Sequence, residues 1–198
     1  MKILKPGIIL LIICAVAGAL LGAVNSATEG PIAEQNAKTT AEAMEVVLPG
    51  AEFGDAVEVE INGGQFSDPN FDLSDADITS YAVGTIDGQE VGYAVSVTTN
   101  GYGGDVVMMV GIDLDGGITG VSVTSMSETA GLGANCQTEW IDQYAGKAAP
   151  LNVTKTGSAG ESEIDAITSA TITSKAVTRG VNTVYYAFTE GLLEGGAA

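Results

Sequence analysis

An unbroken run of apolar and small residues near the N-terminus, residues 8–24, constrains this chain more than any other feature. As an α-helix it is about 26 Å long, and with the apolar residues that precede it the helix can cross a hydrocarbon core of roughly 30 Å. Lys2 and Lys5 flank the run on its N-terminal side, and the next base is Lys38. By the positive-inside rule we expect a single-pass anchor in the plasma membrane, with a cytoplasmic N-terminus and an extracytoplasmic domain.

Two other interpretations of this run stay open. One is a cleaved signal peptide, because residues 23–27 are mostly small. The other is a lipoprotein carrying lipid on Cys14, although the bulky Ile13 stands where a small residue is wanted. The anchor and the cleaved signal both place the rest of the chain outside the cytoplasm.

The charge of the chain is strongly uneven. Every Asp and Glu lies beyond the apolar run, and the region from Thr28 onward holds 25 acids against five bases. A surface this acidic repels phosphate backbones, so we exclude nucleic acid as a partner. The acidity either keeps the domain soluble or forms a docking face for a basic partner or a cation-rich membrane surface.

Residues that usually carry catalysis or bind metals are scarce. The chain has no His, and its two cysteines are Cys14, inside the apolar run, and Cys136. We therefore expect no disulfide, no metal site and no catalytic side chain. Any chemistry must come from a bound cofactor.

The pattern after the apolar run predicts an α+β domain. Residues 31–48 have helical spacing and continue from the anchor to Pro49 and Gly50. Residues 51–79 are acidic and rich in turns, and we predict strand and loop there, with alternation at 57–61. We expect three parts: 1–27 as N-terminus and anchor, 28–79 as a connecting region, and 80–198 as the main domain.

The main domain is predicted to begin with an antiparallel meander. Asp87 and Gly88 give a strong hairpin signal, and a second turn covers 113–117. The four expected strands are 81–86, 91–97, 106–112 and 118–123.

After the meander we expect a Gly-rich loop, a short helix at 139–144 and a polar loop at 154–162. A C-terminal helix is predicted to start near Thr173 or Ser174. Its apolar stripe, which we assign to the core, consists of Val177, Val181, Val184, Tyr185, Phe188 and Leu192.

Hydroxyl side chains crowd the segment 165–174, immediately before this helix. Ser and Thr oxygens commonly cap helix N-termini by accepting bonds from unpaired N–H groups. The same position also suits anion binding, because a helix N-terminus offers N–H donors and a positive dipole end. Local sequence alone leaves both interpretations open.

Residues 165–171, DAITSAT, resemble the acceptor motif of covalently flavinylated FMN-binding domains. There an acid is followed by Ser or Thr, Gly or Ser, Ala and the modified Thr; many members have Gly where this chain has Ser169. The resemblance implies FMN joined by a phosphoester to Thr171, placed there by a flavin transferase that uses FAD and Mg²⁺. It implies that the transferase recognises four residues: Asp165, Thr168, Ser169 and Ala170.

Two more segments resemble the G subunits of Rnf electron transport complexes and the related C subunits of sodium-translocating NADH:quinone reductases. One is NGYGG at 100–104, and the other is ETAGLG at 128–133. Family members usually have Pro in place of Ala130 and often His in place of Ser127. The resemblance implies a flavin pocket with these further residues: Gly101, Tyr102, Gly103, Gly104, Glu128, Thr129, Gly131, Leu132 and Gly133.

The resemblance implies an electron relay rather than an independent catalyst. We expect FMN to pass electrons between other subunits of a membrane complex of the ferredoxin:NAD⁺ type, coupled to Na⁺ or H⁺ movement. Two alternatives remain: a stand-alone membrane-tethered flavin reductase, and a non-redox anchored binding module whose Ser/Thr loop only caps a helix.

Overall fold

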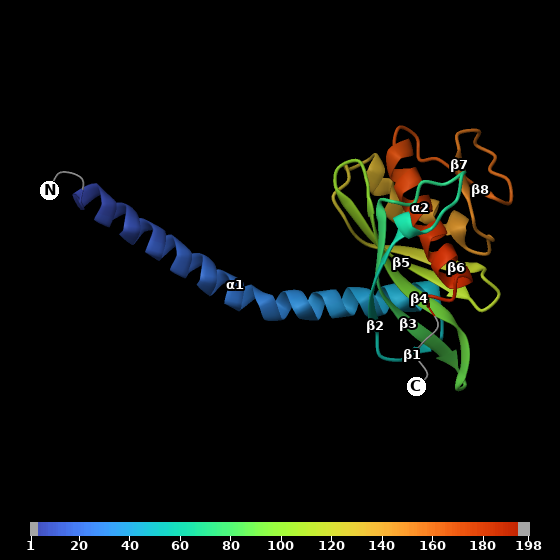
Figure 1. Cartoon of the computed structure of the whole chain (residues 1–198), viewed down its shortest axis with the longest axis horizontal. Coiled ribbons are helices and arrows are strands. Elements are labelled where there is room, and N and C mark those ends of the chain that lie inside the picture. The colour runs from blue at the N-terminus through green and yellow to red at the C-terminus, as the bar shows by residue number, and fades with distance from the viewer. Residues whose placement is uncertain (1–3, 194–198) are drawn as a thin grey trace. The chain divides into compact units, whose positions relative to one another are not determined.

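A computed structural model describes residues 4–193 of the chain (Figure 1). The chain divides into two compact units after Thr39, inside the first helix. That helix, α1 (Leu4–Val47), runs without a break through Pro31. The expected anchor and the expected connecting helix are therefore one element.

Within the described residues, α1 is the one helix long and apolar enough to cross a membrane. None of its most apolar window is buried by the rest of the chain. Its large side chains are exposed, from Ile8 at 51% to Leu21 at 71%. A helix that is apolar all round and uncovered by protein is suited to lipid.

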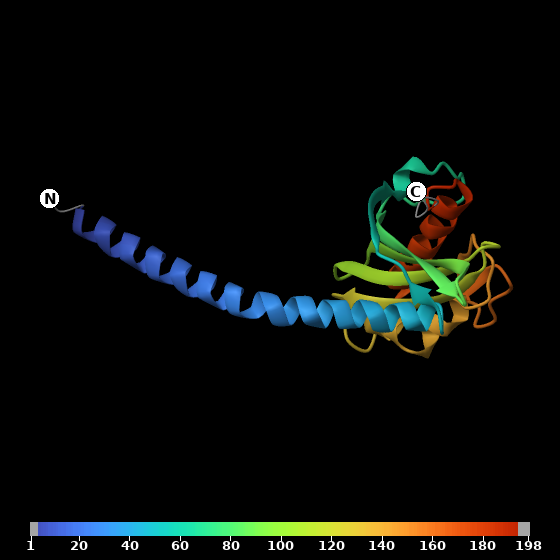
Figure 2. The same ribbon diagram turned by 90° about the horizontal axis from the view of Figure 1, so that it is seen from below.

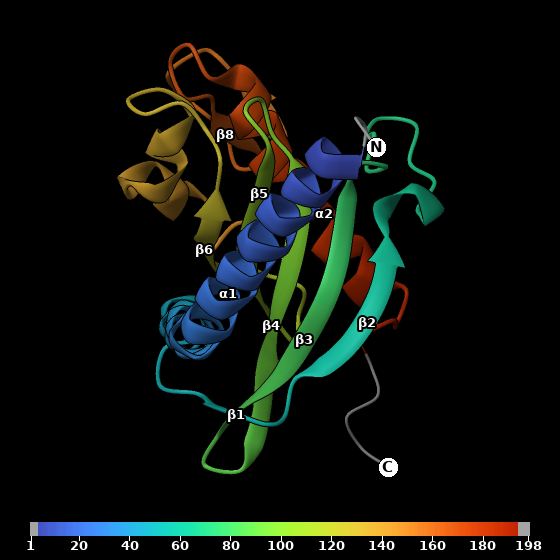
Figure 3. The same ribbon diagram turned by 90° about the vertical axis from the view of Figure 1, so that its left-hand side faces the viewer.

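The second unit is built on the predicted antiparallel meander (Figure 3). The sheet has the order β1-β3-β4-β5-β6, and β2 also pairs with β3. The hairpin at Asp87 and Gly88 is confirmed, with φ of 53° and 76°, as a type I′ turn requires. The strands are β1 (Glu52–Phe53), β2 (Val57–Asn62), β3 (Ala76–Ile86), β4 (Gln89–Asn100), β5 (Asp105–Asp113) and β6 (Ile118–Met126).

Helix α2 (Thr171–Thr189) covers one face of this sheet (Figures 1 and 3). Alternate residues of the central strands, such as Val95 and Met108, form one buried cluster with Val177 and Val181 of the helix. The final turns of α1 pack on a second cluster, which contains Ala94 and Met109. Because residues 94 and 95 alternate in direction along β4, these two clusters lie on opposite faces of the sheet.

Two paired glycines let the end of α1 approach the sheet closely (Figure 2). A Cβ at Gly111 would lie 2.5 Å from the Val47 carbonyl oxygen, and one at Gly120 would lie 3.2 Å from Val47 Cα. The Thr119 hydroxyl donates to that same carbonyl at 2.5 Å. The last carbonyls of a helix lack helical partners, so this bond satisfies one of them.

The apolar stripe on α2 is confirmed for its three valines, but its last member was assigned wrongly. Gly191, with φ of 70°, follows the helix in the left-handed conformation, and Leu192 N–H donates to the Ala187 carbonyl. This Schellman motif reverses the chain direction. Leu192 is consequently 38% exposed, and Leu193 is buried in its place.

The connection from β6 to α2 contains short elements. The predicted helix at 139–144 is present as a 3₁₀ helix, and another precedes it. The polar loop at 154–162 joins two parallel strands that the sequence did not reveal. These elements are η2 (Gly133–Gln137), η3 (Glu139–Tyr144), β7 (Asn152–Thr154) and β8 (Glu163–Asp165); a further 3₁₀ helix, η1 (Gly63–Gln65), follows β2.

Candidate functional site

The hydroxyl-rich segment forms a tight turn between β8 and α2. Ser174 fixes this turn, because its Oγ accepts from Ile167 N–H at 2.9 Å and donates to the Ala170 carbonyl at 3.0 Å. Ser169 has φ of 64°, a conformation that costs a non-glycine residue energy. This geometry explains physically why Gly suits the position.

Helix α2 begins at Thr171, two to three residues earlier than predicted. The predicted start is wrong because Ser174 folds back on the preceding turn instead of starting the helix. The N-cap position is held by Ala170, and no side chain makes a capping hydrogen bond there. The capping interpretation of these hydroxyls is therefore not supported, and the N-terminus of α2 has no side-chain acceptor for its first N–H groups.

Asp165 is held by bonds within its own neighbourhood. Its carboxylate accepts from Gly157 N–H at 2.8 Å and Ala159 N–H at 3.0 Å. Its carbonyl accepts from Trp140 Nε1 at 2.6 Å, and its N–H donates to Gln143 Oε1 at 3.0 Å. Asp165 thus orders the polar loop and fixes the entry to the turn. The sequence pattern does not predict the hydrogen bonds that Trp140 and Gln143 make with Asp165.

A cavity of about 410 Å³ lies beside the start of α2. This volume falls within the usual range for ligand pockets. Eight of the 14 predicted site residues line it, together with two residues that were not predicted, Ile172 and Thr173. The lining consists of Tyr102, Glu128, Thr129, Leu132, Gly133, Ser169, Ala170, Thr171, Ile172 and Thr173.

The other six predicted residues are not part of this lining. They are Asp165, Thr168, Gly101, Gly103, Gly104 and Gly131. The glycines at 101 and 103 instead serve local packing. A Cβ at Gly101 would collide with the Glu128 carboxylate, and one at Gly103 would collide with the Ser127 carbonyl.

Glu128 joins the two glycine-containing loops. It is half-buried, and its Oε1 accepts from Tyr102 N–H at 2.6 Å and from Gly103 N–H at 3.4 Å. A Cβ at Gly133 would lie 2.5 Å from Glu128 Oε2 and 2.7 Å from Thr173 Oγ1. The carboxylate therefore spans the space between the loop that carries Tyr102 and the N-terminal turn of α2.

The rim of the cavity carries exposed apolar side chains. Tyr102 is 72% exposed, Ile172 is 54% exposed and Leu132 is 41% exposed. Each comes from a different segment of the chain, and all three line the same opening. Glu128 is the one acid in the lining. The three rim side chains offer aromatic and aliphatic surface on which a ring system can pack.

Cys136 lies fully buried near this cavity, with its Sγ 3.8 Å from Met126 Sδ. Burial, and secondarily the charge of Glu128, raise the pKa of the Cys136 thiol to about 11. The thiol is therefore neutral at physiological pH and acts as apolar core rather than as a nucleophile. Both cysteines are free thiols. Across residues 4–193, no group of three or more acids, cysteines or histidines is arranged to hold a metal ion.

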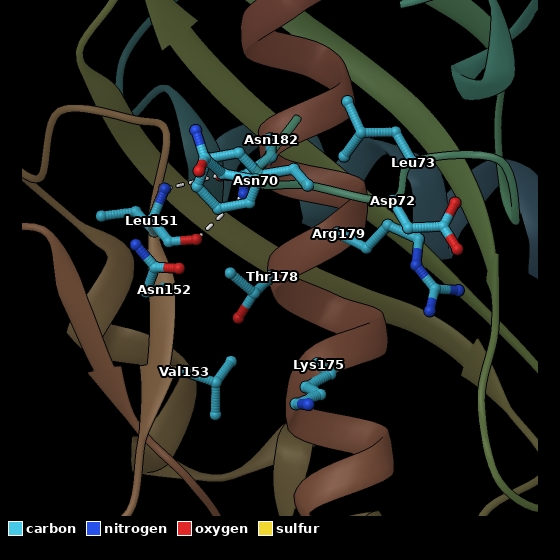
Figure 4. Close-up of a pocket in the computed structure, with 11 residues that line it drawn as sticks. Asn70, Asp72, Leu73, Leu151, Asn152, Val153, Lys175, Thr178, Arg179 and Asn182 are labelled. Carbon is cyan, nitrogen blue, oxygen red and sulfur yellow. Dashed lines mark hydrogen bonds between the residues drawn. The ribbon is translucent and has the colours of Figure 1, made fainter. Parts of the chain in front are cut away.

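A second cavity, of about 340 Å³, lies along α2 (Figure 4). Its lining includes Lys175 and Arg179 from the helix and Asn152 from β7. Deeper in, Asn182 is satisfied by both backbone groups of Leu151, at 2.8 and 2.9 Å. Sequence reasoning missed this cavity, because its parts come from three distant segments.

Two families match the chain. The FMN-binding domain family matches residues 101–186, and the RnfG N-terminal region matches residues 1–47. The FMN-binding match covers the 410 Å³ cavity, so that cavity is the place to test for FMN. The size and the apolar rim of the cavity fit a flavin, and the match argues against a non-redox binding module.

Relatives align along most of their length. The G subunit of the Na⁺-translocating ferredoxin:NAD⁺ oxidoreductase complex of Acetobacterium woodii is 41% identical over 184 residues, which is 91% of this chain and 88% of the relative. The G subunit of the ion-translocating oxidoreductase complex of Photorhabdus laumondii is 32% identical, covering 89% of this chain and 86% of the relative.

A solved structure supports the fold. The crystal structure of Shewanella oneidensis NqrC matches with a TM-score of 0.53 and 19% identity, covering 78% of this chain and 99% of NqrC. Together with the single candidate span in α1, these matches describe a single-pass membrane protein with an FMN-binding domain. The chain belongs to the family of G subunits of Rnf-type ion-translocating oxidoreductase complexes.

Proposed function

We propose that this chain is an electron-transfer subunit of an ion-translocating ferredoxin:NAD⁺ oxidoreductase and carries FMN on Thr171 through a phosphoester. The observation that carries the proposal is the position of Thr171. It is the first residue of an uncapped helix and lines a 410 Å³ cavity with an apolar rim. The names of the relatives supply the type of complex.

The residues around Thr171 suit a phosphorylated flavin. The free N–H groups and the positive end of α2 favour a phosphate there. Tyr102, Leu132 and Ile172 offer apolar surface to the ring, and Glu128 holds the loop that carries Tyr102. When bound, FMN supplies one- or two-electron transfer, and the protein sets its position and its exposure to solvent.

Attachment would be a group transfer from FAD. The Thr171 hydroxyl oxygen forms a bond to the phosphorus of the FMN moiety, the phosphoanhydride bond breaks, and AMP leaves. The hydroxyl proton passes to a base of the flavin transferase, which also supplies Mg²⁺. Of the four proposed recognition residues, Thr168 and Ser169 are exposed. We propose that these two meet the enzyme, while Asp165 presents the turn.

The experiment that tests the attachment is the intact mass of the full chain, produced with an exported flavin transferase. The expected result is a gain of one FMN less one water, with in-gel flavin fluorescence. Thr171→Val keeps the size of the side chain and should abolish both signals, whereas Thr168→Val keeps Thr171 and should retain modification at a lower rate. An unmodified wild-type chain under these conditions would overturn the covalent attachment.

We also propose that the domain faces away from the cytoplasm, because Lys2 and Lys5 precede the span and the next base after it is Lys38. Cysteines placed at Lys2 and Ser158 test this in intact cells with a membrane-impermeant maleimide. Ser158→Cys should be labelled and Lys2→Cys should not. Cys136 gives no background because it is fully buried, and Cys14 gives none because it lies inside the proposed span, which the impermeant reagent does not reach. The reverse labelling pattern would refute the orientation.

The proposed partners are the other subunits of the complex, with the flavin transferase acting during maturation. The relatives differ in coupling ion: one name specifies Na⁺, and a 38% identical relative from Clostridium ljungdahlii is named proton-translocating. Co-purification of the full chain from membranes with other redox subunits is expected. Recovery of a free, flavinylated chain would instead favour a stand-alone flavin reductase.

A further inference from the structure

We propose that Lys175 is a positioning residue for the flavin phosphate, and that its ammonium group pairs with the phosphodiester on Thr171. The inference rests on the proposed attachment of FMN at Thr171. It assigns a role to a side chain that neither the motif nor the lining of the 410 Å³ cavity includes.

The first support is the charge of α2. The chain as a whole carries a net charge of −18. The 19 residues of α2 contain no Asp or Glu, and their charged side chains are Lys175 and Arg179. The helix that begins at Thr171 is therefore a positively charged element in a strongly acidic protein.

The second support is the location of this charge. Acids stabilise the first turn of a helix and cations destabilise it, because the N–H groups there leave a positive end. The first turn of α2 has no acid and no capping side chain, and a cation follows directly at Lys175. An anion covalently held at Thr171 would compensate both the free N–H groups and the lysine.

The third support is the spacing. Thr171 and Lys175 are four residues apart, so their Cβ atoms lie on one face, about 6 Å from each other. Helical side chains lean toward the N-terminus, which directs the lysine toward Thr171. Figure 4 shows Lys175 one turn below Arg179 on α2. A lysine chain is long enough to reach a phosphate on the preceding turn.

The fourth support is the difference between the two cations. Arg179 already pairs with Asp75 at 3.2 Å. Lys175 is exposed and has no ion pair or hydrogen bond among residues 4–193. Its charge is available to a ligand, whereas the charge of Arg179 is engaged within the domain.

A thermodynamic cycle tests the pairing. The full chain in detergent is prepared with and without FMN, the mass of each sample is verified, and unfolding is followed by calorimetry. The quantity compared is the change in Tm that FMN causes. We expect this change to be smaller in Lys175→Gln than in wild type by about 1–3 °C, since exposed ion pairs are modest. Lys175→Arg should restore it.

Lys155→Gln is the matched control, because it removes the same charge from the exposed polar loop. It should leave the FMN-dependent change in Tm at the wild-type value. The effect of Lys175→Gln should also fade in 1 M salt, where charges are screened within about 3 Å. A purely structural role for Lys175 would shift both forms equally and would be insensitive to FMN.

The experiment distinguishes failure of the Lys175 pairing from failure of the FMN attachment. If the mass shows FMN on Thr171 and Lys175→Gln changes the Tm of both forms by the same amount, the pairing is overturned and the attachment stands. If wild type gains no mass, the attachment and the pairing fall together.

Discussion

The two long helices of this protein differ in both burial and composition. The apolar part of α1 is exposed, whereas α2 is largely buried although it contains many polar residues. In α1, the side chains from Ile8 to Val24 are apolar or small, and the large ones are exposed. In α2, 11 of 19 residues are buried, and five of those are Ser, Thr or Asn. Burial within the protein is therefore not a measure of how apolar a helix is. The uncovered apolar surface of α1 needs a lipid environment.

Four of the five buried polar residues of α2 have side-chain hydrogen-bond partners: Ser174, Thr178, Asn182 and Thr183. The Thr178 hydroxyl lies 2.7 Å from the Tyr144 hydroxyl and donates to the Ser174 carbonyl at 2.9 Å. Asn182 bonds both backbone groups of Leu151. A paired polar group in a core costs little, whereas an unpaired one costs several kcal/mol. These pairs also tie α2 to η3 and to Leu151, which immediately precedes β7.

The largest effect that would sharpen this comparison is a charge placed in each helix. Val181→Asp puts an unpaired carboxylate at a fully buried position and should cost about 4 kcal/mol or more, enough to unfold the domain. Val16→Asp, at a 54% exposed position of α1, should leave the domain folded and lower membrane insertion by about 3 kcal/mol. Protease resistance measures the first effect, and the membrane-bound fraction measures the second. A folded Val181→Asp domain would contradict the assignment of α2 to the core.

A smaller effect comes from adding one methyl group to each helix. A Cβ at Gly180 would lie 2.9 Å from both Met108 Cε and Thr99 Cγ2, while one at Gly22 would meet nothing within 4 Å. Gly180→Ala gains helix propensity but overfills the contact with the sheet, so we expect a net loss of about 1 kcal/mol. Gly22→Ala should leave unfolding of the domain unchanged. Calorimetry measures the free energy of unfolding of both variants. An equal change in the two would show that the contact between α2 and the sheet can relax.

The smallest effect concerns the turn that starts α2. Ser169→Gly removes the cost of a left-handed serine and should stabilise the domain by about 0.5 kcal/mol, net of the greater flexibility of glycine. Ser158→Gly, in the polar loop, has no such strain to relieve and should be neutral or slightly destabilising. Urea unfolding of the two variants side by side measures the difference. Destabilisation by Ser169→Gly would mean that the serine side chain contributes more than its backbone strain costs.

Much of this architecture could be predicted because its signals are local. The apolar run predicts α1, and the alternation around Asp87 and Gly88 predicts the central hairpin. Both depend on periodicity within a few residues. The motif resemblance likewise selected Thr171, and Leu132 from a distant segment lines the same cavity.

What could not be predicted depends on contacts between distant segments. The start of α2 depends on how Ser174 bonds to Ile167 and Ala170, which no helix propensity encodes. The parallel pair β7 and β8 is too short to leave a period. Gly101 was assigned to the cofactor from the sequence, yet its lack of a side chain makes room for Glu128. A glycine pattern indicates that another group packs closely against the backbone, but it does not identify that group.

Because Trp140 donates to the Asp165 carbonyl, its intrinsic fluorescence can report on a cofactor bound near Thr171. Trp140 is the one tryptophan in all 198 residues, and its indole is half-buried against the segment that leads to Thr171. Tryptophan emission overlaps flavin absorption, so a chromophore arriving at this turn would quench a single, unambiguous donor. The progress of cofactor loading can then be followed in real time, without a label, from light that the polypeptide itself emits.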